Sequence, residues 1–332
     1  MKLGLMLGYS GAIPTVPIDL VKEAERIGYD SVWTAEAYGS DVFSPLCWVG
    51  AQTTRIKLGT GVMQLSARTP ACVAMTAATI DHLSNGRLLL GIGVSGPQVV
   101  EGWYGQSFPK PLARTREFVA LVREMLERKG PVTFHGEHYD LPLQGGSHLG
   151  KPLKLIVHPK RSHIPIYMGA EGPKNVKLAT EIADGWLPIF YSPYRSYVYA
   201  DSLKDLRPDF EIACAVTVIL HDDVKQALNM AKPYIAFYIG GMGAKEKNFH
   251  LDLIGRFGFA EEARRVQELF LSGKRAEAIA AVPEQLVDEI TLAGPKERIR
   301  DRLGAWKESP VTTLLVGSQE PSVVRFMAEE LL

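Results

Sequence analysis

The stretch of residues 88–105, LLLGIGVSGPQVVEGWYG, decides the fold of this chain. Its first five residues form an apolar run with the length and composition of a strand buried on both faces. The run ends in residues 93–97, whose glycines allow a positive φ and the close approach of another molecule. A buried strand followed by such a loop is typical of the carboxyl end of a parallel sheet, where α/β proteins bind ligands. An ordinary strand-to-helix turn is the alternative interpretation of this stretch alone.

Strands and helices alternate along most of the chain, with short connections that favour a parallel sheet covered by helices. Eight expected strands in this order predict the α/β class and a (β/α)8 TIM barrel with insertions, as one domain over residues 1–332. An open doubly wound sheet is the alternative, but no G-x-G-x-x-G turn follows the first strand. We expect a hairpin-bearing insertion at about 130–161 and a long helical insertion at about 222–306. The expected strands are 1–7, 31–35, 56–63, 88–92, 164–169, 185–190, 210–219 and 312–316.

Composition excludes several classes of function. The 332 residues contain 37 Lys and Arg against 37 Asp and Glu, so the charge gives no case for nucleic acid or a membrane surface as partner. Cys47, Cys72 and Cys214 are too few and too scattered for a disulfide framework or a metal site. We see no signal peptide and no run of about 20 apolar residues. The sequence therefore predicts a cytoplasmic protein without a metal, whose partner is a small-molecule substrate.

The candidate chemistry lies where the strands end, because all strand ends of a barrel meet on one face. Glu36 follows the second strand and is expected either to transfer a proton or to accept a hydrogen bond from a cofactor. A structural carboxylate in a salt bridge is the alternative. Residues 169–172 open a helix with small residues and could bind a phosphate, or could simply start that helix. Further candidates at strand ends are Gly61, Val62, Met63, Gln64, Val94, Ser95, Gly96, Gln98 and Glu101.

A basic cluster lies just before the fifth expected strand and consists of His158, Lys160, Arg161 and His163. Such a run is usually a solvated face of the protein. Here it could instead meet an acidic tail of a ligand.

Five segments together resemble the luciferase-like flavin and deazaflavin oxidoreductases, and in particular their actinobacterial coenzyme F420-dependent branch. No single segment is specific, but the combination is. The segments are WTAEAYGSD (33–41), LGTGVMQLSARTP (58–70), LSNGRLLLGIGVSGPQVVEGWYG (83–105), IPIYMGAEGPKNVKLA (164–179) and ADGWLP (183–188).

The resemblance implies a barrel that holds coenzyme F420 at its carboxyl-end face, in a homodimer. It also implies a cis peptide bond at Gly61-Val62 that supports the ring of the cofactor. Ser95 and Gly96 would flank the ring or its ribityl chain. The backbone of Gly169, Ala170, Glu171 and Gly172 would bind the phosphate.

The expected activity is hydride transfer between the deazaflavin C5 and a small organic substrate. Where relatives that oxidise alcohols have Asp-His, this chain has Glu36-Ala37, which favours the reductase direction. Glu36 and Glu101 are the expected catalytic residues, and Tyr9, Trp103 and Tyr104 are expected to line the substrate pocket. Two alternatives stay open: a monooxygenase that uses FMN, and a carrier that binds F420 without turnover.

Overall fold

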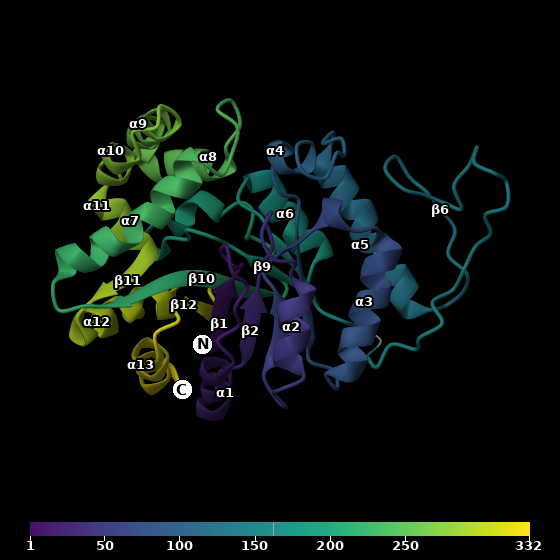
Figure 1. Ribbon diagram of the computed structural model, residues 1–332, viewed down its shortest axis with the longest axis horizontal. Helices are drawn as coiled ribbons and strands as arrows, with labels where there is room; N and C mark the ends of the chain where they lie inside the picture. Colours follow the sequence, from purple (N-terminus) through teal and green to yellow (C-terminus); the bar gives the residue numbers. More distant parts are fainter. Residues whose placement is uncertain (162) are drawn as a thin grey trace.

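The computed structural model of the protein describes residues 1–161 and 163–332, and its parallel strands close into a barrel (Figure 1). Closure occurs at β10, which pairs in parallel with both β9 and β12. The prediction of a (β/α)8 barrel is confirmed. In order around the barrel the strands are β1 (Lys2–Gly8), β2 (Ser31–Thr34), β3 (Lys57–Thr60), β5 (Leu88–Gly93), β8 (Ile166–Gly169), β9 (Gly185–Leu187), β10 (Glu211–Leu220) and β12 (Thr313–Gly317).

Helices cover the outside of the barrel because each carries an apolar stripe at helical spacing. The first of them, α1, buries Leu20, Val21 and Ala24 and ends at Gly28, whose φ of 104° is left-handed. Burial of these stripes against the strands forms one continuous core. The outer helices are α1 (Ile18–Ile27), α2 (Phe43–Gly50), α3 (Pro70–Leu83), α5 (Pro111–Glu127), α6 (Pro173–Ile182), α12 (Lys296–Glu308) and α13 (Pro321–Leu331).

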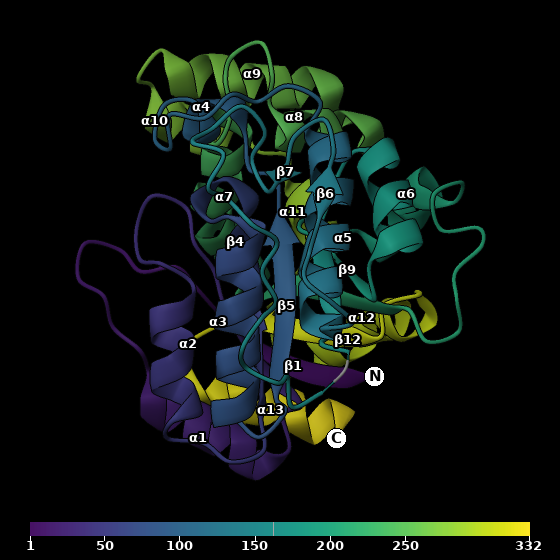
Figure 2. The ribbon, with the colours of Figure 1, turned by 90° about the vertical axis from the view of Figure 1, so that its right-hand side faces the viewer.

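A second group of helices lies over the carboxyl ends of the strands. Figure 2 shows the arrow of β5 pointing towards α4 and α8. The sequence predicts a helical stretch over 222–306 with a break at 240–243, but β11 (Thr291–Gly294) also interrupts it and pairs with β10. This is possible because β10 runs for ten residues and its last part extends past its pairing with β12. The helices of this group are α4 (Pro97–Val100), α7 (Val224–Gly240), α8 (Phe249–Ile254), η3 (Gly255–Phe259), α9 (Ala260–Leu271), α10 (Arg275–Ala280) and α11 (Glu284–Ile290).

The third strand is interrupted, whereas the sequence predicted one strand over 56–63. β3 ends at Thr60, and the chain resumes as β4 (Met63–Gln64) after a cis peptide bond between Gly61 and Val62. The cis bond implied by the family resemblance is therefore present. β3 pairs with the start of β5, and β4 pairs with its end. Between them, the Thr60 hydroxyl donates to the Gly91 carbonyl at 2.7 Å and accepts from the Gly91 N–H at 2.8 Å.

Residues 130–161 form an arm that extends away from the barrel beside α5 (Figure 1). The arm contains a short antiparallel hairpin made of β6 (Phe134–His135) and β7 (Asp140–Leu141). Glu117 of α5 anchors the hairpin turn by accepting hydrogen bonds from the N–H groups of residues 137–139.

The basic cluster lies at the amino ends of the strands, so the idea that it meets an acidic tail of a ligand at the site is wrong. Arg161 donates to both carboxylate oxygens of Asp81 at 3.1 Å and to the carbonyl of Leu88, the first residue of β5. His163 contacts Asp184 at 2.9 Å, ahead of β9. The reason is structural, since both residues precede β8, where the Arg161 guanidinium pairs with Asp81 and the His163 ring contacts Asp184.

Replacing Asp81 by asparagine is expected to lower the free energy of unfolding by about 3 kcal/mol, because Arg161 then loses a fully buried counter-charge. Urea unfolding of the variant measures this loss. The control is Glu137→Gln, which removes the exposed ion pair with Lys110 and should change stability by less than about 1 kcal/mol. Equal, small losses in both variants would contradict a structural role for Asp81.

Candidate active site at the carboxyl ends of the strands

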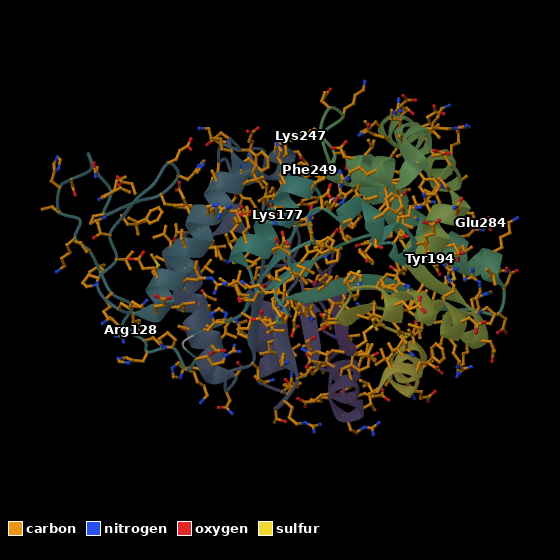
Figure 3. All side chains as sticks on the ribbon, turned by 180° about the vertical axis from the view of Figure 1, so that it is seen from behind. Arg128, Lys177, Tyr194, Lys247, Phe249 and Glu284 are labelled. Carbon is orange, nitrogen blue, oxygen red and sulfur yellow. The ribbon has the colours of Figure 1, made fainter. Side chains whose placement is uncertain are left out.

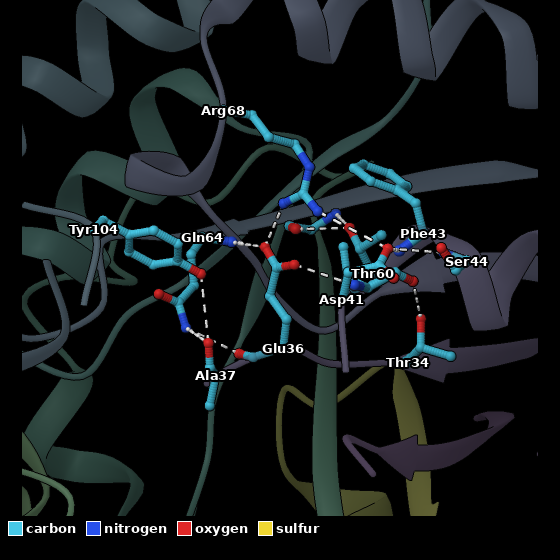
Figure 4. Close-up of polar contacts among 12 residues, drawn as sticks. Thr34, Glu36, Ala37, Asp41, Phe43, Ser44, Thr60, Gln64, Arg68 and Tyr104 are labelled. Carbon is cyan, nitrogen blue, oxygen red and sulfur yellow. Dashed lines mark hydrogen bonds and ion pairs between the residues drawn. The ribbon is translucent and has the colours of Figure 1, made fainter. Parts of the chain in front are cut away.

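Glu36 is the centre of a buried polar network (Figure 4). Its side chain is 3% exposed, and Arg68 donates to its Oε1 at 2.6 Å. The N–H of Gln64 donates to the same oxygen at 2.8 Å, and the N–H of Val42 donates to Oε2 at 3.1 Å. Both oxygens of this carboxylate are therefore occupied by protein donors.

The network fixes the loops that follow β2 and β3 against each other. The Gln64 amide nitrogen donates to the carbonyls of Glu36 and Ala37, while its buried Oε1 has no partner among the described residues. Arg68 also lies 5.0 Å from the centre of the Phe43 ring. Gln64 Oε1 is thus a buried acceptor that a bound group with an N–H could satisfy.

Val62, which follows the cis bond, packs into a gap left by two glycines. A Cβ on Gly93 of β5 would lie 2.6 Å from a Val62 methyl group, and a Cβ on Gly169 of β8 would lie 3.1 Å from one. Since Gln64 pairs with Gly93 in the sheet, the ends of β2, β4, β5 and β8 meet on one face. The structure therefore brings together the strand-end positions that the sequence placed in one site.

The loop after β5 differs in detail from the expectation that its glycines carry the positive φ. That conformation falls on Ser95, with φ of 59°, while the φ of Gly96 is −112°. Gly96 is instead needed for space, because a Cβ there would lie 2.5 Å from the Gln98 amide oxygen. Val94 is partly buried against the core, beside Ser95.

Of the aromatic and acidic residues after α4, Tyr104 lies closest to the Glu36 network. Its hydroxyl donates to the Ala37 carbonyl at 3.4 Å. Burial and the Glu36 charge raise the pKa of Tyr104, and Arg68 partly offsets them. Trp103 is 65% exposed, and Glu101 is exposed as well.

The loop after β8 is surrounded by groups from distant segments. Gly172 is the N-cap of α6, and the Ala170 carbonyl accepts a hydrogen bond from the Trp186 indole. Arg256 of η3 donates to the Glu171 carbonyl at 2.7 Å, and its buried Nε has no partner among the described residues. This cation and the start of α6 together favour an anionic guest.

His250 of α8 approaches the same loop, with its Nδ1 2.7 Å from Glu171 Oε1. Its ring packs edge-on against Tyr238 at 4.8 Å and against Phe190 at 6.0 Å. Tyr238 in turn interacts with the hydroxyl of Tyr9, the residue after β1. Burial raises the pKa of Tyr9, and the contact with Tyr238 opposes that shift.

An open cavity of about 500 Å³ lies between α5 and α6, beside the loop after β8. Arg116, Lys174 and Lys177 line it together with Glu181 and Asp201, so its charges nearly balance. Lys177, on α6, is labelled in Figure 3. We assign the chemistry to the strand ends rather than to this cavity, since Glu36 and Gln64 do not line it.

Sequence reasoning missed four residues of this face: Arg68, Tyr238, His250 and Arg256. Arg68 lies within a segment that carries the family resemblance, but no role was assigned to it. The other three belong to the stretch 222–306, where side chains of this kind are usually part of a helical surface or core. No local signal could have shown that they meet Glu171 and Tyr9.

Residues 1–161 and 163–332 contain no group of three His, Cys, Asp or Glu side chains that could hold a metal ion. Among them, no helix combines the length and apolar character that crossing a bilayer requires.

Comparison with known proteins agrees with this architecture. A family model described as luciferase-like monooxygenase matches residues 5–313. A Mycobacterium tuberculosis protein that bears the name "Putative coenzyme F420-dependent oxidoreductase" is 51% identical over 340 residues, which cover 99% of this chain and 98% of that one.

Solved structures of similar proteins share the fold. The coenzyme F420-dependent tetrahydromethanopterin reductase of Methanopyrus kandleri superposes with a TM-score of 0.79 at 25% identity, over 99% of this chain and 97% of that one. An F420-dependent secondary alcohol dehydrogenase superposes with a TM-score of 0.77 over 99% and 98% of the two chains, but at 17% identity it supports the fold alone. Because the family model spans almost the whole barrel, this chain belongs to the luciferase-like monooxygenase family.

Proposed function

We propose that this protein is a coenzyme F420-dependent oxidoreductase that reduces a small, largely apolar organic substrate. One observation carries the proposal: the full-length relative at 51% identity bears the name of an F420-dependent oxidoreductase. The polar groups of the site fit such a cofactor. Gln64 Oε1 is a buried acceptor without a partner among the described residues. Arg256, which donates to the Glu171 carbonyl, has a buried Nε that is also without a partner among them and would donate to an anion.

When bound, F420 supplies a hydride from its C5 position. The chain's own residues position the reactants. Gln64 Oε1 would accept from a ring N–H, and Val62 with Ser95 would border the ring. Arg256 and the start of α6 would hold the phosphate, next to Gly172.

The two expected catalytic carboxylates differ in their surroundings. Glu36 contributes mainly by fixing Gln64 and Arg68, because its two oxygens already accept from protein donors. Glu101 is exposed and could exchange a proton with solvent, and Tyr9, Trp103 and Tyr104 would border the substrate.

The proposed function is tested by mixing the purified protein with reduced F420 and a panel of enones, imines and quinones. Oxidation of the cofactor is followed by its absorbance. We expect turnover with at least one member of the panel. Tight binding of F420 without any turnover would instead favour the carrier. The apolar Ala37, where relatives that oxidise alcohols have a histidine, is consistent with that alternative.

We also propose that the protein is a homodimer, as the family resemblance implies. Trp48 of α2 and Met75 of α3, on neighbouring helices (Figure 2), are 61% and 59% exposed, and a partner chain would cover these apolar side chains.

Trp48→Arg is therefore expected to convert a dimer into a monomer, because a buried cation at the interface is costly to desolvate. Sedimentation velocity measures the change in mass. Tyr197→Arg, at an equally exposed aromatic residue of η2 (Pro193–Tyr199), is the control and should leave the dimer intact. A wild-type monomer would contradict the proposal.

A further inference from the structure

Neither expected carboxylate is well placed to move a proton at the site. The oxygens of Glu36 accept from Arg68, Gln64 and Val42, and its side chain is 3% exposed. Glu101 lies at the exposed end of α4. Reduction of a polar double bond needs a proton in addition to a hydride, so another group has to supply it.

His250 has the surroundings of such a group. Its side chain is 16% exposed, so it is largely buried but still accessible, and Glu171, 13% exposed, faces its Nδ1 at 2.7 Å. The angles at this contact fall short of a hydrogen bond, as is common for catalytic contacts before ligands bind. The second oxygen of Glu171 is buried and has no partner among the described residues. Reorientation of either side chain would complete a hydrogen bond between them.

The position of His250 connects it with the expected substrate residues. His250 lies in α8, the helix towards which β5 points in Figure 2, and Figure 3 labels the preceding residue, Phe249, in the upper part of the molecule. The His250 ring packs against Tyr238, and Tyr238 interacts with Tyr9. Tyr9 was predicted to line the substrate pocket, so the imidazole and the expected pocket share one aromatic wall.

We propose that His250 is a catalytic residue that donates the proton of the reduction, and that Glu171 is the positioning residue that orients it. This inference rests on the proposed function. It assigns to the site a substrate class: compounds with a polarised double bond whose heteroatom can accept a hydrogen bond from an imidazole.

The step balances in atoms and electrons. When bound, reduced F420 would supply the hydride to the electrophilic carbon, and the electron pair of the double bond would move to the heteroatom. The Nε2–H of the imidazolium gives that heteroatom its proton, which leaves a neutral ring with Nδ1–H directed at Glu171. The carboxylate keeps its charge throughout, as in other carboxylate–histidine pairs.

Charged and titratable groups approach His250 from each neighbouring element. Glu171 comes from the loop after β8, Arg256 of η3 contacts that loop from the other side, and Tyr234 and Tyr238 come from α7. Burial raises the pKa of Tyr234 to about 12, so it stays neutral near pH 7. Among the described residues, Glu171 is thus the only group in direct contact with the ring whose charge would stabilise an imidazolium.

The test compares His250→Gln with the wild type in two measurements. Fluorescence titration with F420 should give dissociation constants within about threefold of each other. Turnover with the fastest substrate of the panel should fall about 100-fold in His250→Gln, the size expected for loss of a general acid. The matched control is His135→Gln, which removes the His–Asp pair of the arm and should leave turnover within twofold.

A third measurement needs neither cofactor nor substrate. Nitrogen-15 spectra of the cofactor-free protein at alkaline pH should show His250 with its proton on Nδ1, and Glu171→Leu should shift it to Nε2. If the neutral His250 ring of the wild type carries its proton on Nε2, the pairing of His250 with Glu171 is overturned. This result does not depend on whether His250→Gln folds. If His250→Gln keeps the turnover of the wild type, or loses tenfold in F420 affinity, the assignment of His250 as the proton donor is overturned, but the proposed function is not. A wild type that turns over nothing would end the proposed function and this inference with it.

Discussion

Glu36→Gln is expected to lower the free energy of unfolding by about 3 kcal/mol and turnover by at least about tenfold. Three donors converge on the carboxylate, from Arg68, Gln64 and Val42. An amide presents an NH₂ group in place of one oxygen, so at least one donor would face another donor. Arg68, 17% exposed, would also lose its close counter-charge, since Asp41 lies 4.0 Å away. Breaking a buried ion pair typically costs 3 kcal/mol or more.

Turnover should fall because Glu36 holds the loop that carries Gln64 next to the expected ring. Urea unfolding and steady-state kinetics of the same preparation measure the two effects. The control is Asp30→Asn, which breaks a partly exposed pair with Lys57 and should cost less than about 1 kcal/mol. Stability and turnover like those of the wild type would remove Glu36 from both the structure and the mechanism of this site.

Gly91→Ala is expected to destabilise the protein by about 3 kcal/mol, at the upper end of the cost of overpacking. A Cβ at this position would lie 1.9 Å from the Thr60 carbonyl oxygen and 2.7 Å from a Leu187 methyl group. The Thr60 oxygen belongs to the backbone of β3 and cannot rotate away. β3 and β5 would have to separate where Thr60 now bridges them by two hydrogen bonds.

The matched control for Gly91→Ala is Gly304→Ala in α12. A Cβ on Gly304 meets no atom within 4 Å, so alanine should stabilise the helix by up to about 1 kcal/mol. Thermal and urea unfolding of both variants should therefore give shifts of opposite sign. Two small shifts of the same sign would show that the approach of β3 to Gly91 is looser than the structure describes.

The sequence predicted the barrel because its signals are local. The apolar run of residues 88–92 has the length of a buried strand, and Gly28 ends a helix in a left-handed conformation. Repetition of strand and helix with short links then restricts the topology. The cis bond after Gly61 could be expected only from the family resemblance, since no composition or periodicity indicates it.

Features that depend on distant contacts could not be predicted. Arg161 appeared as part of a free basic cluster because its partner, Asp81, lies 80 residues earlier in the chain. β11 was missed because a four-residue strand among helices has too short a pattern to recognise. His250 and Arg256 reach the site only through the packing of α8 and η3, which no local pattern reveals.

The proposed function depends most on the identity of the cofactor. Fluorescence titration of the purified wild type with F420 and, separately, with FMN tests this directly. We expect saturable binding of F420 with a dissociation constant at least tenfold lower than that of FMN. We also expect weaker F420 binding in Arg256→Met, which removes the cation proposed to hold the phosphate. Tight binding of FMN without binding of F420 would contradict the account and favour an FMN-dependent monooxygenase.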